Sequence, residues 1–271
     1  MKKYQKAAII FFIISVVLYF GYNGYEKINT DKVPPVITAP EGVLKISVEA
    51  KEKDLLKGVK AVDAVSGDVT DTIVIESISP FTESNTRIIT YAAIDGSQNI
   101  GRLERTMEYT DYERPRFELS GPLRVPSGIS SPILKNVHAY SNLDGDISSR
   151  VKYTYSEYFN TTHVGACTVE FRVMDSAGTV EYLPAIVEVY DERVERIEVN
   201  LTDYLVYIDK GDEFTAEKYF KNSSTEGKLD IISNVDTDKP GIYLVDYIVS
   251  ADSNVGKTNL IVIVTENEVD N

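Results

Sequence analysis

Residues 90–102 read Thr-Tyr-Ala-Ala-Ile-Asp-Gly-Ser-Gln-Asn-Ile-Gly-Arg, and residues 61–70 read Ala-Val-Asp-Ala-Val-Ser-Gly-Asp-Val-Thr. Before the first turn, Tyr91 and Ala93 alternate with their neighbours, and a cluster of Asp, Gly and Ser follows in both stretches. Side chains alternate between the two faces of a strand, so this spacing indicates half-buried strands. The polar clusters are typical of tight turns. We therefore predict short antiparallel strands joined by such turns.

Both stretches return farther along the chain. Gly-Asp-Val-Thr at residues 67–70 returns as Gly-Asp-Ile-Ser at residues 145–148, a spacing of 78. Asp95 returns as Asp175 after 80 residues, and Asp252 follows 77 residues later in a third unit without the Gly-Asp turn. Similarity at a fixed period indicates tandem structural units. Several short strands in each unit of about 80 residues predict small antiparallel sandwiches.

The first unit contains Pro34-Pro35, Ala61-Val62-Asp63, residues 67–70, Tyr91 and Asp95 in this order. With these features it resembles the bacterial surface Ig-like domain, a family found in tandem on cell-surface proteins and in a pesticidal crystal protein. The second and third units keep part of this pattern at Pro115, residues 143–148, Phe171, Asp175, residues 211–214 and residues 240–243. The resemblance implies three tandem Ig-like antiparallel β-sandwiches, and it implies little about function.

The expected fold is therefore all-β, with three such sandwiches behind one N-terminal transmembrane helix. The expected segments are a basic tail at 1–6, a signal anchor at 7–25, a linker at 26–32, Ig-like domains at 33–112, 113–191 and 192–266, and a tail at 267–271. The linkers are short and charged, so we expect three semi-independent domains arranged end to end.

The N-terminus suggests the compartment. Lys2, Lys3 and Lys6 precede an apolar run over residues 7–22, which Tyr and Gly extend to residue 25. A spanning helix needs about 20 residues, and basic residues stay on the cytoplasmic side. We expect a single-pass membrane protein with a cytoplasmic N-terminus and an extracellular bulk. Cleavage as a secretory signal stays open, although the run lacks an Ala-x-Ala site.

Composition narrows the chemistry. With 28 basic and 42 acidic residues, the chain carries a net charge of −14, which argues against nucleic-acid binding. Cys167 is the single cysteine, so disulfide frameworks and cysteine metal clusters are excluded. We read Cys167 as a small buried hydrophobe. His138 and His163 lie in no catalytic or metal-binding spacing, and we expect no enzyme activity.

Carboxylates near the turns form the candidate metal sites. Calcium binds six to eight oxygens, several from carboxylates. The two candidate weak calcium sets are Asp63, Asp68 and Asp95 in the first unit and Asp144, Asp146 and Asp175 in the second. Aspartate beside glycine is also typical of Asx turns, in which the side chain accepts turn amides. On the sequence alone we favour the turn interpretation and expect no cofactor.

The expected role is a surface stalk with protein-binding or adhesion surfaces, and its partner is an unidentified surface or envelope protein. Two alternatives stay open: an accessory subunit of an envelope-spanning membrane complex, and a cleaved, secreted carbohydrate-associated module. An aromatic stripe at Tyr153, Tyr155, Tyr158 and Phe159 is expected to pack on the core. The absence of Trp further disfavours carbohydrate binding.

Overall fold

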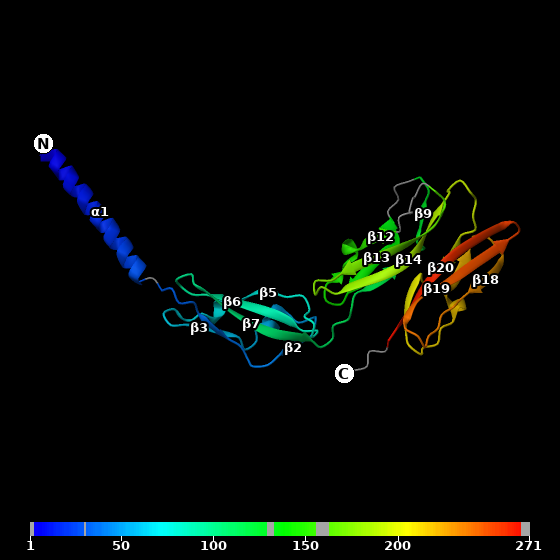
Figure 1. Cartoon of the computed structure of the whole chain (residues 1–271), viewed down its shortest axis with the longest axis horizontal. Coiled ribbons are helices and arrows are strands. Elements are labelled where there is room, and N and C mark those ends of the chain that lie inside the picture. The colour runs from blue at the N-terminus through cyan, green and yellow to red at the C-terminus, as the bar shows by residue number, and fades with distance from the viewer. Residues whose placement is uncertain (1–2, 30, 129–132, 156–162, 267–271) are drawn as a thin grey trace. The chain divides into compact units, whose positions relative to one another are not determined.

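The computed structural model describes residues 3–29, 31–128, 133–155 and 163–266 (Figure 1). Strands make up 47% of the structure and helices are few, so the all-β prediction is confirmed. The chain divides into two compact units, Met1–Asp111 and Tyr112–Asn271. The first unit holds one sandwich and the second unit holds two.

The N-terminal segment is the helix α1 (Lys3–Asn29). Its large apolar side chains are exposed over the described stretch, including Phe11 at 74% and Leu18 at 67%. Within the part of the chain that the structure describes, no helix is both long enough and apolar enough to cross a membrane. The transmembrane part of the predicted fold class is therefore not shown.

The first sandwich packs a sheet of order β1-β3-β4 against one of order β2-β7-β6-β5. Residues from both sheets share one core, in which Ala61, Ile89, Tyr91 and Met107 are fully buried. The alternation around Tyr91 thus faces that core, as expected for a half-buried strand. The elements are β1 (Val36–Thr38), β2 (Leu44–Ile46), α2 (Glu52–Leu55), β3 (Lys60–Asp63), β4 (Gly67–Asp68), η1 (Thr70–Thr72), β5 (Val74–Ile78), β6 (Arg87–Ile94) and β7 (Ile100–Tyr109).

The second sandwich repeats this arrangement, with sheets of order β11-β10-β8 and β12-β13-β14-β9. Phe117, Val137, Val169 and Phe171 join the two sheets in one core. The elements are β8 (Arg116–Leu119), β9 (Arg124–Pro126), η2 (Ile133–Asn136), β10 (Val137–Ser141), β11 (Gly145–Asp146), η3 (Ser148–Arg150), β12 (Lys152–Tyr155), β13 (Gly165–Met174) and β14 (Val180–Tyr190).

The third sandwich has a smaller first sheet, β15-β17, facing a sheet of order β16-β20-β19-β18. Val199 and Leu201 from the first pack with Tyr247 and Leu260 from the second. The elements are β15 (Val199–Leu201), β16 (Leu205–Asp209), η4 (Ala216–Tyr219), β17 (Phe220–Ser223), β18 (Lys228–Ile232), β19 (Gly241–Ala251) and β20 (Asn254–Thr265).

The second and third sandwiches pack against each other inside one compact unit. Ile261 on β20 belongs to the core cluster of the second sandwich, and Ile263 packs against that cluster. The backbone N–H of Phe117 also donates to the Tyr207 hydroxyl across 2.9 Å. The expectation of semi-independent domains is therefore wrong for this pair. The physical reason is that β20 buries apolar side chains on both of its faces.

Candidate metal centre

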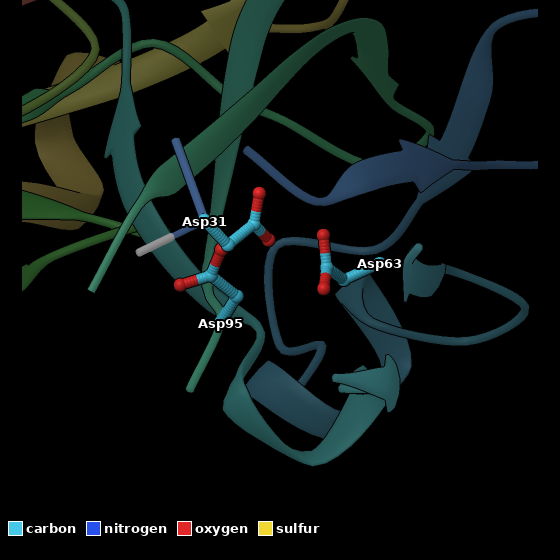
Figure 2. Close-up of side chains that lie close together, drawn as sticks. All are labelled: Asp31, Asp63 and Asp95. Atoms are coloured by element: carbon cyan, nitrogen blue, oxygen red, sulfur yellow. The ribbon is translucent and has the colours of Figure 1, made fainter. Parts of the chain in front are cut away.

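Three aspartates from separate parts of the first sandwich meet at one of its ends. Asp31 precedes β1, Asp63 is the last residue of β3, and Asp95 follows β6. One carboxylate oxygen from each lies within 4.8 Å of the others. Asp63 and Asp95 are 4% and 5% exposed. Figure 2 shows the carboxylates of Asp31 and Asp63 facing each other, with Asp95 beside Asp31.

Asp63 uses one of its two oxygens to hold a turn. Its Oδ1 accepts the backbone N–H groups of Val65 at 2.9 Å and Ser66 at 2.6 Å. The Ser66 N–H lowers the pKa of the Asp63 carboxyl below its usual range and outweighs the opposing effect of burial. Among the described residues, no group donates to the buried Oδ2 of Asp63. That oxygen is therefore free for a ligand.

Asp95 organises the hairpin between β6 and β7. Its Oδ1 accepts the N–H groups of Ser97 and Asn99, each at 2.8 Å. Its Oδ2 accepts the side-chain amide of Asn99 at 2.7 Å. Because these bonds fix the carboxylate from the hairpin side, Asp95 is preorganised at the edge of the cluster.

Asp31 is held in the cluster by its backbone. Its carbonyl accepts the Asn99 side-chain amide at 3.1 Å, and its Oδ1 accepts the Val33 N–H at 3.0 Å. A Cβ atom on Gly101 would lie 2.0 Å from the carbonyl oxygen of Pro35, so only glycine lets this segment lie so close to β7. The Asp31 Oδ2 is buried and has no hydrogen-bond partner among the residues that the structure describes.

The other predicted site residues lie outside this cluster. Asp68 is exposed and its Oδ1 accepts the Thr70 N–H at 3.0 Å; Asp146 makes the same contact with Ser148 at 2.9 Å. Strand register explains why Asp68 does not join the cluster. Asp68 pairs with Val62, so it lies on the same face as Val62, and Asp63, the next residue along β3, points to the opposite face. The predicted set of Asp63, Asp68 and Asp95 is therefore not the set that meets, since Asp31 takes the place of Asp68.

The two remaining carboxylates of the second sandwich are bound by protein groups. Asp144 accepts Arg150 Nη1 and the Ser176 hydroxyl, each at 2.6 Å. Asp175 accepts the Tyr112 hydroxyl at 2.5 Å and the Thr179 N–H at 2.9 Å. The second predicted calcium set is therefore not gathered into a shared site within the described residues.

Other singled-out side chains occupy ordinary positions. Cys167 is half-buried, with its sulfur 3.7 Å from the Val187 carbonyl, and burial raises its pKa. The core-packing prediction is wrong for the described part of the aromatic stripe, since Tyr153 and Tyr155 on β12 are 38% and 54% exposed. Tyr158 and Phe159 lie outside the described residues.

Comparison with known proteins gives structural neighbours alone. No protein-family profile and no curated protein matches the chain. One neighbour is the M60 catalytic domain with two CBM51 domains of Clostridium perfringens ZmpB, with 11% identity over 87% of this chain and 31% of that one, at a TM-score of 0.23. A CBM51 domain of the same protein in complex with GlcNAc, with its INT domains, has 16% identity over 86% of this chain and 42% of that one, at 0.22.

The human desmocollin-1 ectodomain is a further neighbour, with 12% identity over 86% of this chain and 62% of that one, at a TM-score of 0.21. This chain thus spans less than half the length of the two bacterial structures. At these scores and identities, the neighbours assign neither a ligand nor an activity to this chain.

Proposed function

We propose that this protein is a membrane-attached bacterial surface protein whose β-sandwiches act as a stalk and protein-binding module. The observation that supports attachment is the run from Ile9 to Ile14 on α1, where every residue is apolar and at least 48% exposed. Successive helical residues are 100° apart, so this run places apolar side chains on all sides of the helix. Such a helix needs an apolar environment.

The charges around this helix suggest its orientation. Lys2, Lys3 and Lys6 precede the apolar run, and the chain beyond residue 30 is strongly acidic. Positive residues next to an apolar segment stay in the cytoplasm. The N-terminus is therefore inside and the sandwiches are outside, where an acidic surface stays soluble and avoids anionic lipids.

A protein partner fits the surface of the first sandwich. Val36 and Val62 are cross-strand neighbours on β1 and β3 with exposures of 65% and 55%, and Val65 in the next turn is 73% exposed. Adjacent exposed apolar side chains favour contact with another protein. We also infer that the protein is a binding module rather than an enzyme. The Ser120 hydroxyl lies 3.1 Å from His138 Nε2, but both side chains are exposed to water, whereas active sites exclude water from the reacting groups.

Membrane attachment is tested in cells that express the full chain. Protease added to intact protoplasts should digest the sandwiches, while α1 stays in the membrane fraction after an alkaline wash. The double variant Phe11→Lys, Ile14→Lys should leave the membrane, since a charge in the apolar layer costs about 3 kcal/mol. Tyr4→Lys, outside the apolar run, is the matched control. Release of wild-type chain that begins after residue 25 would contradict the proposal.

Partner binding is tested separately. A photo-crosslinking residue at Val62 should capture a membrane or envelope protein that the same residue at Asp71, exposed on η1, does not capture. Specific binding of the chain to immobilised glycans would favour a carbohydrate-associated module instead. A stoichiometric membrane complex purified with the chain would favour the role of an accessory subunit.

A further inference from the structure

We propose that Asp31, Asp63 and Asp95 bind one calcium ion, which fastens the segment before β1 to the end of the first sandwich. The site goes beyond the proposed function, since surface display requires no metal. It also changes the interpretation reached from the sequence, which favoured turns alone. The turns are present, but they use one oxygen of Asp63 and leave the other unpartnered.

Without a cation, this arrangement of carboxylates is costly. Three carboxylates come within 4.8 Å of one another, and two of them are at least 95% buried. Among the described residues, none of the three forms a salt bridge. Buried carboxylates without a neutralising positive charge are strongly unfavourable, and Asp31 Oδ2 and Asp63 Oδ2 also lack a hydrogen bond among the described residues. A bound cation supplies the positive charge and is coordinated by these two oxygens.

The size of the cluster and its donor atoms suit calcium. The ligand atoms are carboxylate oxygens, which suit hard cations rather than zinc or copper. Calcium–oxygen distances of about 2.3–2.6 Å allow oxygens of one shell to lie up to about 5 Å apart. The three oxygens lie within 4.8 Å of one another, so they fit inside one calcium shell. Magnesium keeps several of its waters and is usually bound by only one or two carboxylates, so a set of three carboxylates favours calcium.

The protein holds the three aspartates in place through hydrogen bonds. Asn99 donates its side-chain amide both to Asp95 Oδ2 and to the Asp31 carbonyl, so it joins the hairpin to the leading segment. The turn amides of Val65 and Ser66 orient Asp63 from the other side. Hydrogen bonds of this kind, made to the ligand side chains, preorganise a metal site. Water completes the six to eight oxygens that calcium takes.

Calorimetric titration of calcium chloride into the chelator-treated full chain in detergent tests the site. We expect one calcium per chain, with weaker binding of magnesium. Asp63→Ser keeps an oxygen for the turn amides and removes the free carboxylate oxygen, so it should weaken binding more than about 10-fold. Asp31→Asn, outside the strands, should do the same. Asp71→Asn makes the same charge change at an exposed position and should bind as wild type.

Hydrogen exchange supplies a local readout. Calcium should protect the backbone amides of residues 31–33, 36 and 37 in the wild type and in Asp71→Asn, and not in Asp63→Ser or Asp31→Asn. Unchanged protection of the β6 amides shows that a variant is folded. If Asp63→Ser does not fold, the result for Asp31→Asn alone tests the site. No binding up to about 10 mM calcium, well above the range of extracellular modules, would overturn the proposal. Equal affinity in wild type and both site variants would overturn it too. Neither result affects membrane attachment.

Discussion

Asp63 in the first sandwich and Ser141 in the second occupy the same position in their folds. Each ends a strand and pairs with the glycine of a two-residue strand, Gly67 or Gly145. Asp63 Oδ1 accepts two turn N–H groups, and Ser141 Oγ accepts the corresponding pair, from residues 143 and 144, at 3.1 and 3.4 Å. One side-chain oxygen is thus enough for this turn, so the second oxygen of Asp63 is available for another task.

The hairpin aspartates differ in the same way. Asp95 and Asp175 each accept backbone N–H groups of their own hairpin. Asp175 also accepts the neutral hydroxyl of Tyr112, whereas Asp95 accepts the side-chain amide of Asn99 and lies beside the carboxylates of Asp31 and Asp63. The two repeats therefore surround the same buried carboxylate differently. The second supplies a protein hydroxyl, and the first supplies an amide and, by our proposal, a cation shared with Asp31 and Asp63.

Gly101→Ala should have the largest effect, because its Cβ would lie 2.0 Å from the Pro35 carbonyl oxygen. We expect the segment that carries Asp31 to shift, with a loss of about 3 kcal/mol of stability and of calcium binding. The second sandwich places Glu181 at the same register, opposite Val173, so it has no such close approach. Calorimetric titration and urea unfolding measure both effects. Gly21→Ala, with nothing within 4 Å, is the control and should change neither.

Calcium removal should lower the stability of the first unit and leave that of the second unchanged. At about 100 times its dissociation constant, calcium should raise the unfolding free energy of the first unit by about 2.7 kcal/mol. The second unit should not respond, because its carboxylates already have protein partners. Hydrogen exchange at increasing urea, with and without chelator, reports the two units separately. A calcium effect of equal size on both units would contradict the comparison.

Tyr112→Phe should make the second sandwich resemble the first. It removes the hydroxyl that donates to Asp175, which is 3% exposed, and leaves that carboxylate short of one partner. We expect a loss of about 2 kcal/mol from the second unit in urea unfolding. Tyr182→Phe alters an exposed hydroxyl on β14 and should cost little. Equal stability of the two variants would show that Tyr112 does not satisfy Asp175.

Tyr91→Phe should have the smallest effect. The Tyr91 hydroxyl donates to the Leu55 carbonyl at 2.8 Å, and Tyr247 makes the same kind of bond to Ala216 at 2.7 Å. The second sandwich has Phe171 at this position and does without the bond. We therefore expect a loss of about 1 kcal/mol from the first unit in urea unfolding, with calcium binding unchanged. A loss as large as that of Gly101→Ala would be inconsistent with this view.

The repeats, the strands and the inward residues such as Tyr91 follow from alternation and turn chemistry along the chain. Asp31 could not be assigned in that way, because it reaches Asp63 and Asp95 only when the segment before β1 docks on β7 through Gly101. The exclusion of Asp68 from the cluster follows from its pairing with Val62, because strand register sets the face on which each side chain lies. Sequence spacing alone does not supply that pairing.

The contact between the last two sandwiches was missed for a different reason. Residues 260–264 read Leu-Ile-Val-Ile-Val, a continuous apolar run. Such runs are typical of strands buried on both faces. The alternation of Leu260, Val262 and Val264 predicts one buried face and leaves Ile261 and Ile263 unassigned. The second face was therefore present in the sequence, but the surface that covers it belongs to the other domain.

The parallel strand pair in each sandwich has a mechanical consequence. Strands β2 and β7 run parallel, as do β9 with β14 and β16 with β20. When the two ends of a sandwich are pulled apart, parallel strands slide lengthwise, so their hydrogen bonds are strained together rather than broken one after another. The pair β16–β20 aligns five residues where the other two align three. Under tension, the third sandwich should therefore yield at the highest force.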